Sequence, residues 1–214
     1  MSTFDNAALS RGSFAAQAFD AQFRVASVHP APSQSFQVAK RIVDVVVSLI
    51  ALIALALPAA VIALLIKRES EGPILAKQTV VGRNGQSFTL FTFRSTHNPA
   101  LDMAESDQTR VGVFLHATGL TIIPEFINVL LGDMSLVGPR PVRTSSYRVV
   151  AHQIPGFTRR LAVRPGMTGL AQIKGVGDLS LTEELAYDHA YITTSSLVAD
   201  ARIAAQALTK AFTA

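Results

Sequence analysis

Four arginines stand in settings that we interpret as rigid, at a strand end or in turns that contain proline or glycine. They are Arg94 at the end of an apolar run, Arg110 before Val111-Gly112, Arg140 within Gly-Pro-Arg-Pro, and Arg164 before Pro165-Gly166. A rigid turn pre-aims a guanidinium group, which can then hold phosphate oxygens through two parallel hydrogen bonds. A single arginine of this kind is more often paired with a local acid or used to cap a helix. With four such arginines, we weigh phosphate binding equally with these structural roles.

The composition excludes several other chemistries. The chain has no cysteine, which rules out disulfides, thiolate nucleophiles and cysteine-based zinc sites. Its five histidines are far apart in sequence and none shows the i, i+4 pairing of a helical metal site, so we interpret them as ordinary polar residues and predict no metal centre built on them. A formal net charge of +4 fits contact with anionic lipid or a phosphorylated substrate. It lacks the concentrated basic face of a nucleic-acid binder, and we predict no nucleic-acid partner.

Residues 45–66 contain no charged residue and are long enough, at about 1.5 Å per residue, to cross a hydrocarbon core of about 30 Å. Lys40-Arg41 precedes this segment and Lys67-Arg68 follows it. Pro58 near its middle removes a backbone donor and predicts a bend at that residue. Cations at both ends and a central break favour a re-entrant hairpin whose two ends lie on the same membrane face. A kinked ordinary span remains the alternative, because the positive-inside rule is a bias.

The segments on either side of this apolar helix have different patterns. We predict a flexible tail for residues 1–36, with the membrane helix at 37–68 and a cytosolic domain at 69–214. Two β-branched and aromatic runs joined through Asn84-Gly85 predict a β-hairpin, because both turn residues tolerate positive φ.

Two amphipathic helices are expected after the hairpin. Ile123, Phe126, Ile127 and Leu130 are spaced as a helical stripe that faces a core, with the helix starting near Pro124. A closing helix is expected over residues 197–212. Together these elements predict a mixed α/β (α+β) fold, in which a re-entrant membrane hairpin joins a small cytosolic domain.

Several strings occur in an order and spacing typical of one protein family. They are KRIVD at 40–44, VGRNGQSF at 81–88, FRS at 93–95, NVLLGDMSLVGPRP at 128–141 and RPGMTGLAQIKG at 164–175. The chain thereby resembles the bacterial sugar transferases, the monotopic polyprenyl-phosphate phosphoglycosyl transferases of exopolysaccharide and glycan assembly. The resemblance implies a re-entrant helix at the cytoplasmic face of the bacterial inner membrane. It also implies Mg²⁺-assisted transfer of a sugar 1-phosphate from a nucleotide diphosphate sugar to undecaprenyl phosphate.

The family's catalytic Asp-Glu pair is replaced in this chain. The family typically has Ser-Leu-Asp-Glu-Leu-Pro, whereas residues 119–124 read Gly-Leu-Thr-Ile-Ile-Pro. Thr121 is a poor nucleophile without a base, and Ile122 has no polar group. Glu125 could act as a substitute acid from one helical turn away, or could be a solvent-facing carboxylate in the first turn of a helix. Other charged residues common in the family are also lost, so that Thr92 stands where a lysine is frequent.

These replacements lead to competing hypotheses. The first is a catalytically impaired pseudoenzyme that acts as a partner or regulator among polysaccharide-assembly proteins, and that binds polyprenyl phosphate or a nucleotide sugar through Arg94, Arg110, Arg140 and Arg164. The second is an active transferase with a relocated acid, for which Mg²⁺ would be the expected cofactor. A third is a membrane-anchored interaction domain with an empty site.

Overall fold

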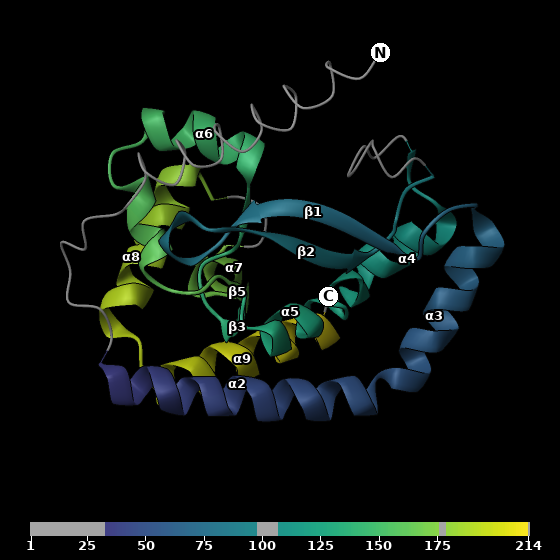
Figure 1. Cartoon of the computed structure of the whole chain (residues 1–214), viewed down its shortest axis with the longest axis horizontal. Helices are drawn as coiled ribbons and strands as arrows, with labels where there is room; N and C mark the ends of the chain where they lie inside the picture. Colours follow the sequence, from purple (N-terminus) through teal and green to yellow (C-terminus); the bar gives the residue numbers. More distant parts are fainter. Residues whose placement is uncertain (1–32, 98–106, 176–178, 214) are drawn as a thin grey trace, which may run out of the picture.

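The computed structural model describes residues 33–97, 107–175 and 179–213. Its mixed helical and sheet architecture agrees with the expected α/β class. Figure 1 shows two long helices, α2 and α9, along the lower side, with a β-hairpin above them and α6 at the opposite side. All but the end of the expected 1–36 tail lies outside the described residues. Helix α2 begins at Gln34, where the Ser33 hydroxyl accepts a hydrogen bond from the backbone N–H of Phe36.

The apolar segment forms two helices with a sharp bend between them. Helix α2 (Gln34–Ala54) and helix α3 (Ala56–Glu69) meet at 61°. The break lies at Leu55, and not at Pro58 as predicted. Pro58 is the third residue of α3, and it cannot donate to the carbonyl of Ala54, so the helix is interrupted one turn before the proline.

No single helix in the described ranges is long and apolar enough to cross a bilayer. Two bent pairs meet that criterion by length and composition: α2 with α3, and α4 (Arg110–Ala117) with residues 120–131.

Helix α2 is polar on its inner side and apolar on its outer side. The buried side chains of α2 are Asp44 and Ser48. Its exposed large side chains are Val38, Ile42, Val43, Val46, Val47, Leu49, Ile50 and Ile53. Asp44 accepts a hydrogen bond from the backbone N–H of Leu136 at 3.1 Å, which connects this inner side to the folded domain. A water-facing amphipathic helix has the opposite arrangement, with its apolar side toward the core and its polar side toward solvent.

The predicted hairpin is confirmed. Strands β1 (Leu75–Val81) and β2 (Ser87–Phe93) pair antiparallel, and the short 3₁₀ turn η1 (Arg83–Gly85) joins them. Asn84 and Gly85 both have positive φ, at 57° and 82°. Strand β4 (Val142–Arg143) adds to the free edge of β1, giving the order β2-β1-β4.

A second, two-stranded parallel sheet brings the Gly-Pro-Arg-Pro string at 138–141 and the Arg-Pro-Gly string at 164–166 together. Strands β3 (Ser135–Val137) and β5 (Gly166–Thr168) pair, and Gly166 N–H donates to the carbonyl of Pro139 at 2.9 Å. A Cβ atom at Gly166 would lie 2.1 Å from the backbone nitrogen of Gly138. This close approach requires glycine at position 166.

Helix α5 (Glu125–Leu131) starts directly after Pro124, as predicted, but buries a different set of side chains. Its buried residues are Glu125, Asn128 and Val129, whereas Ile127 is partly exposed to solvent. The prediction that Ile127 faces the core is therefore wrong. The reason is that α5 packs against both β2 and α2, and Asn128 bonds the backbone of β2 through Phe91 N–H and the Thr89 carbonyl.

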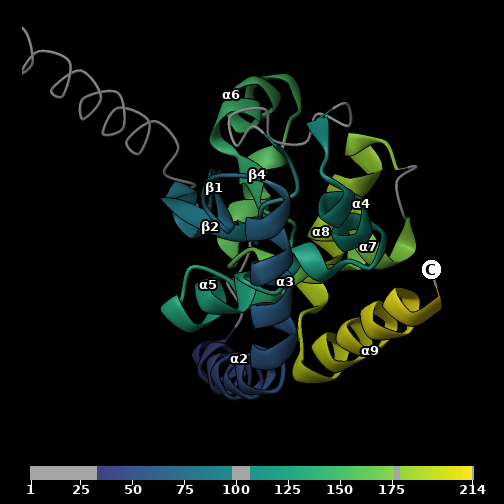
Figure 2. The same cartoon turned by 90° about the vertical axis from the view of Figure 1, so that its right-hand side faces the viewer.

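The remaining helices enclose the sheets. They are α6 (Thr144–Gln153), the 3₁₀ helix η4 (Phe157–Ala162), α7 (Leu170–Lys174), α8 (Leu181–Thr194) and α9 (Leu197–Thr213). Helix α9 confirms the expected closing helix, and Figure 2 shows it beside α2 on the lower side of the molecule. Lys40 of α2 forms an ion pair with Asp200 of α9 at 2.6 Å, which joins the two helices.

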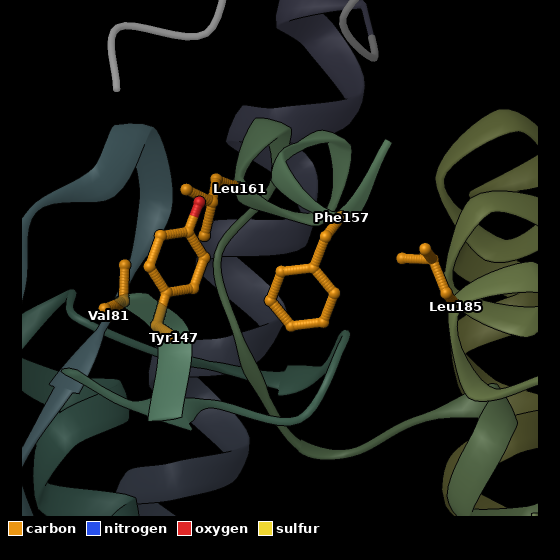
Figure 3. Packing of buried hydrophobic residues seen from close by; sticks show 5 residues of the cluster. All are labelled: Val81, Tyr147, Phe157, Leu161 and Leu185. Atoms are coloured by element: carbon orange, nitrogen blue, oxygen red, sulfur yellow. The ribbon is translucent and has the colours of Figure 1, made fainter. Parts of the chain in front are cut away.

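One core cluster lies between the hairpin and α8. Figure 3 shows the rings of Tyr147 and Phe157 between Val81 and Leu185, with Leu161 beside them. The two ring centroids are 5.6 Å apart. Because these residues come from β1, α6, η4 and α8, the cluster fixes the loop that carries Arg140 relative to the hairpin.

Candidate functional site

A pocket of about 250 Å³ opens between the hairpin, the α4–α5 connection and the loop after β3. Its lining includes Gln78, Thr92, Ser95, His116, Thr121, Ile122, Glu125, Arg140, Arg143 and Gln172. The lining therefore combines two arginines with neutral polar groups and one carboxyl group.

Thr121 and Ile122 both lie in this lining. They belong to the 3₁₀ helix η3 (Leu120–Ile122), which follows Gly119 in the left-handed region at φ 68°. The side chain of Ile122 is exposed by 39%, which is high for an apolar residue of this size. An apolar side chain thus forms part of the pocket wall.

Glu125 lies in the same lining and is buried, with 7% of its surface exposed. Burial raises the pKa of Glu125 to about 8, and the nearby charge of Arg140 opposes that rise only in part. The neutral form of the carboxyl group is therefore favoured at neutral pH, which makes it a weak nucleophile there. The interpretation of Glu125 as a solvent-facing carboxylate is wrong, because α5 packs its first turn against the domain.

Of the four predicted arginines, the structure places only Arg140 in the pocket lining. Its side chain is exposed, while its backbone carbonyl accepts a hydrogen bond from Arg160 at 3.1 Å. An exposed guanidinium group on a fixed backbone suits Arg140 for contact with a ligand in the pocket.

Arg94 points away from the pocket, although its neighbours Phe93 and Ser95 line it. Successive side chains of an extended strand alternate between faces, which explains the difference. Arg94 is 1% exposed and donates hydrogen bonds to the carbonyls of Ser70 and Glu71, just beyond the end of α3. Arg94 therefore fixes the backbone that follows the C-terminal end of the apolar segment.

Arg110 and Arg164 also lie outside this lining. The side chain of Arg110 is exposed at the start of α4, where Glu69 accepts hydrogen bonds from the backbone N–H groups of Arg110 and Val111 at 2.6 and 2.8 Å. Arg164 donates to the carbonyl of Gly132 at 3.0 Å and lines two other cavities. The structure thus disperses a set of arginines that the sequence suggested as one site.

Several lining residues were missed from the sequence. Arg143 donates to Gln78 Oε1 at 3.1 Å across the β1–β4 edge. His116, interpreted from sequence as an ordinary polar residue, has Nε2 3.0 Å from the hydroxyl oxygen of Ser95. The buried Oε1 of Gln172 has no hydrogen-bond partner among the described residues. Arg143 stands two residues after Pro141. Its position near a proline-containing turn is the signal that could have identified it.

This arrangement can bind a phosphate-bearing molecule. Arg140 and Arg143 supply two cations, and Ser95, His116 and Gln172 supply polar groups for hydroxyl or amide partners. The donor set does not fit Mg²⁺, which prefers several oxygen ligands, because the lining holds a single carboxyl group and that group is buried. In the described part of the chain, no group of three or more histidine or acidic residues could hold a metal ion.

Comparison with known proteins shows which family has a sequence similar to this chain. Residues 35–214 match the sequence model of a family described as bacterial sugar transferase. The chain is 40% identical over 187 residues to the UDP-glucose:undecaprenyl-phosphate glucose-1-phosphate transferase of Caulobacter vibrioides, covering 81% of this chain and 70% of that protein. It is 37% identical over 183 residues to the exopolysaccharide production protein PSS of Rhizobium leguminosarum, covering 78% of this chain and 91% of that protein.

A longer relative aligns over only part of its length. The UDP-glucose:undecaprenyl-phosphate glucose-1-phosphate transferase of Escherichia coli is 34% identical over 185 residues, which cover 81% of this chain and 40% of that protein. The similarity therefore lies in the segment that contains both the apolar helices and the pocket.

Proposed function

Because this chain belongs to the bacterial sugar transferase family, we propose that it is a catalytically impaired member that retains ligand binding. It acts at the cytoplasmic face of the bacterial inner membrane as a partner or regulator among the proteins of exopolysaccharide assembly. Its ligand is a nucleotide sugar or undecaprenyl phosphate, the compounds named for its relatives.

The observation that carries this proposal is the composition of the pocket wall at residues 121–125. The wall presents a hydroxyl at Thr121, an apolar side chain at Ile122 and a carboxyl group of raised pKa at Glu125. Covalent phosphoryl transfer needs an ionised nucleophile in line with the phosphorus atom and charge stabilisation around it. Thr121 and Ile122 have no carboxylate, and the raised pKa of Glu125 disfavours its ionised form at neutral pH.

Retention of binding is supported by the two arginines of the lining. Arg140 and Arg143 face the same pocket of about 250 Å³, a volume that suits part of a nucleotide sugar. Their backbone positions are fixed by the buried Arg160 and by pairing with β1.

Membrane attachment through a re-entrant hairpin is supported by the bent α2–α3 pair. The outer side of α2 is apolar, and α3 exposes Leu57, Val61, Leu64 and Leu65. Basic residues lie near the start of α2 and in the last turn of α3, so both ends suit contact with anionic headgroups of one leaflet.

The absence of native cysteine allows a clean topology experiment. Ser35→Cys and Glu71→Cys place single thiols at exposed positions on either side of the hairpin. In intact cells, a membrane-impermeant maleimide should label neither position, and both should react after lysis. Labelling of one of them in intact cells would establish a kinked span.

The function is tested by two measurements on the full chain in nanodiscs. With undecaprenyl phosphate, Mg²⁺ and a panel of nucleotide diphosphate sugars, the wild type should release no nucleoside monophosphate. Calorimetry should detect binding of one of these sugars, and Arg140→Met should weaken it about tenfold or more through loss of a charge-assisted contact. Arg110→Met is the matched control, because that exposed arginine does not line the pocket. Release by the wild type, or no binding of any ligand, would contradict the proposal.

An active transferase with a relocated acid is the second candidate, favoured by the position of Glu125 in the lining. In this case monophosphate release should increase as the pH rises toward 8, where the carboxyl ionises, and Glu125→Gln should abolish it. Release that survives Glu125→Gln would exclude Glu125 as the nucleophile and direct attention to the Ser95–His116 pair.

A further inference from the structure

A second cavity lies at the C-terminal end of α5, away from the pocket at Thr121. It has a volume of about 280 Å³ and is lined by the hairpin turn at Arg83 and Asn84, by Gly132 and Asp133, and by Arg164. The two cavities share no lining residue. Any ligand of this second cavity therefore contacts a different set of side chains.

Arg83 and Arg164 carry positive charge that is not neutralised by a direct ion pair. In the described ranges, neither of them nor the nearby Arg41 has a carboxylate within ion-pair distance. The Nε of Arg83 is buried and has no hydrogen-bond partner there. This is an unusual state for a guanidinium group, since buried donors are nearly always paired.

The positive charges of Arg83 and Arg41 both repel that of Arg164. Arg164 donates to the carbonyl of Gly132, and Arg41 donates to the carbonyl of Leu130 at 2.9 Å, so both converge on the end of α5. Burial and then the charges of Arg83 and Arg41 lower the pKa of Arg164, while Asp44 acts in the opposite direction. The carbonyls at the C-terminal end of α5 thus accept hydrogen bonds from two guanidinium groups.

Acidic groups offset this charge only in part. Asp133 lines the cavity, and Asp44 is buried with one oxygen bonded to Leu136 N–H. Three cations against two carboxylates leave a net positive charge around the cavity. Two guanidinium groups facing one cavity suit a tetrahedral phosphate, which accepts paired hydrogen bonds from each.

The surroundings of the cavity indicate a phosphate that carries hydrocarbon. Leu131, directly before Gly132, is 66% exposed. Val38 and Ile42 on α2 are also exposed, on either side of the arginine at position 41 that bonds α5. A polar cavity at the margin of an exposed apolar surface has the arrangement of a lipid headgroup site, in which the acyl chains cover the apolar side.

We propose that Arg83 and Arg164 bind the headgroup phosphate of an anionic membrane lipid in a site separate from the pocket at Thr121. The site holds the α2 face of the protein against the membrane surface. It does not depend on the proposed function, because it uses none of the residues of that pocket.

The test is native mass spectrometry of the full chain released from detergent that contains phosphatidylglycerol. Wild-type protein should retain bound lipid, and Arg83→Gln should lower the retained fraction about tenfold, as expected for loss of a charge-assisted phosphate contact. Arg83 is the better first target because its side chain makes no hydrogen bond with another described residue, so its replacement should not affect folding. Arg164→Lys retains the charge without the bidentate geometry and should have an intermediate effect.

The matched control is Arg148→Gln, which removes the same charge from an exposed position on α6, opposite α2 in Figure 1. This variant should retain lipid as the wild type does. Equal retention by Arg83→Gln and Arg148→Gln would overturn the proposal. Millimolar inorganic phosphate should fail to displace the lipid, and complete displacement would show a site for free anions and overturn the assignment to a lipid.

Discussion

The guanidinium group of Arg160 donates a hydrogen bond to the backbone carbonyl of Arg140 at 3.1 Å. The same side chain is buried, lies 2.8 Å from Asp188 and 3.0 Å from Glu184, and stacks over the ring of Phe157. An ion cluster between η4 and α8 therefore holds the loop that presents Arg140 to the pocket.

Replacement of Arg160 should destabilise the whole domain. Arg160→Leu leaves Asp188 buried without its cation and removes the bond to Arg140, which should lower the free energy of unfolding by about 3–5 kcal/mol. Arg159→Leu is the control, because its side chain is exposed on the same 3₁₀ helix. Thermal unfolding should show a much larger loss for Arg160→Leu, and equal melting temperatures would contradict this role.

Glu125→Gln should change how stability depends on pH. The unfolded carboxyl ionises near its ordinary pKa of 4.5 and the folded one only near 8, so the unfolded state loses this proton first as the pH rises. The contribution of this group to stability therefore falls between those pH values, by up to about 1.4 kcal/mol per unit.

Glutamine does not titrate, so the melting temperature of Glu125→Gln should rise relative to wild type between pH 5 and pH 8. Thermal unfolding in detergent at several pH values measures this difference. Glu71→Gln, at an exposed position, should show no such trend. A constant difference across the range would mean that Glu125 is ionised in the folded protein.

Arg94→Met should loosen the end of the apolar segment without direct loss of a pocket contact. The replacement leaves the carbonyls of Ser70 and Glu71 without their donor, and we expect a loss of about 1–3 kcal/mol. Hydrogen exchange of the amides in residues 66–72 should accelerate, whereas Arg140→Met should leave them unchanged. Unaltered exchange in Arg94→Met would argue against this structural role.

Gly112→Ala should disturb the wall that carries Ser95 and His116. A Cβ atom at Gly112 would lie 2.0 Å from the Ser95 carbonyl oxygen, so α4 would have to move away from the end of β2. Gly119→Ala meets no atom within 4 Å, although its φ of 68° costs about 1 kcal/mol for a residue with a side chain. Gly112→Ala should lower the melting temperature more than Gly119→Ala, and the reverse order would contradict the close packing at Gly112.

Part of the site could be located from sequence because the signals were local. The positions of Thr121, Ile122 and Glu125 follow from the spacing of the surrounding motifs, and the structure brings all three into one pocket. The hairpin at Asn84-Gly85 was predictable because the turn needs two residues that accept positive φ. Which arginines enter the pocket was not predictable, since a rigid turn fixes a backbone but not the direction of its side chain.

The sequence by itself determined the family pattern, the apolar segment and the hairpin. The tertiary structure decided that Arg94 holds the end of α3, that Arg143 and His116 face the pocket, and that burial raises the pKa of Glu125. It also decided that the helix breaks at Leu55 and that Arg83 lies near Arg164. The physical reason is that turns and periodicity depend on neighbours in the chain, whereas burial, pKa and like-charge contacts depend on segments far apart in sequence that meet only after folding.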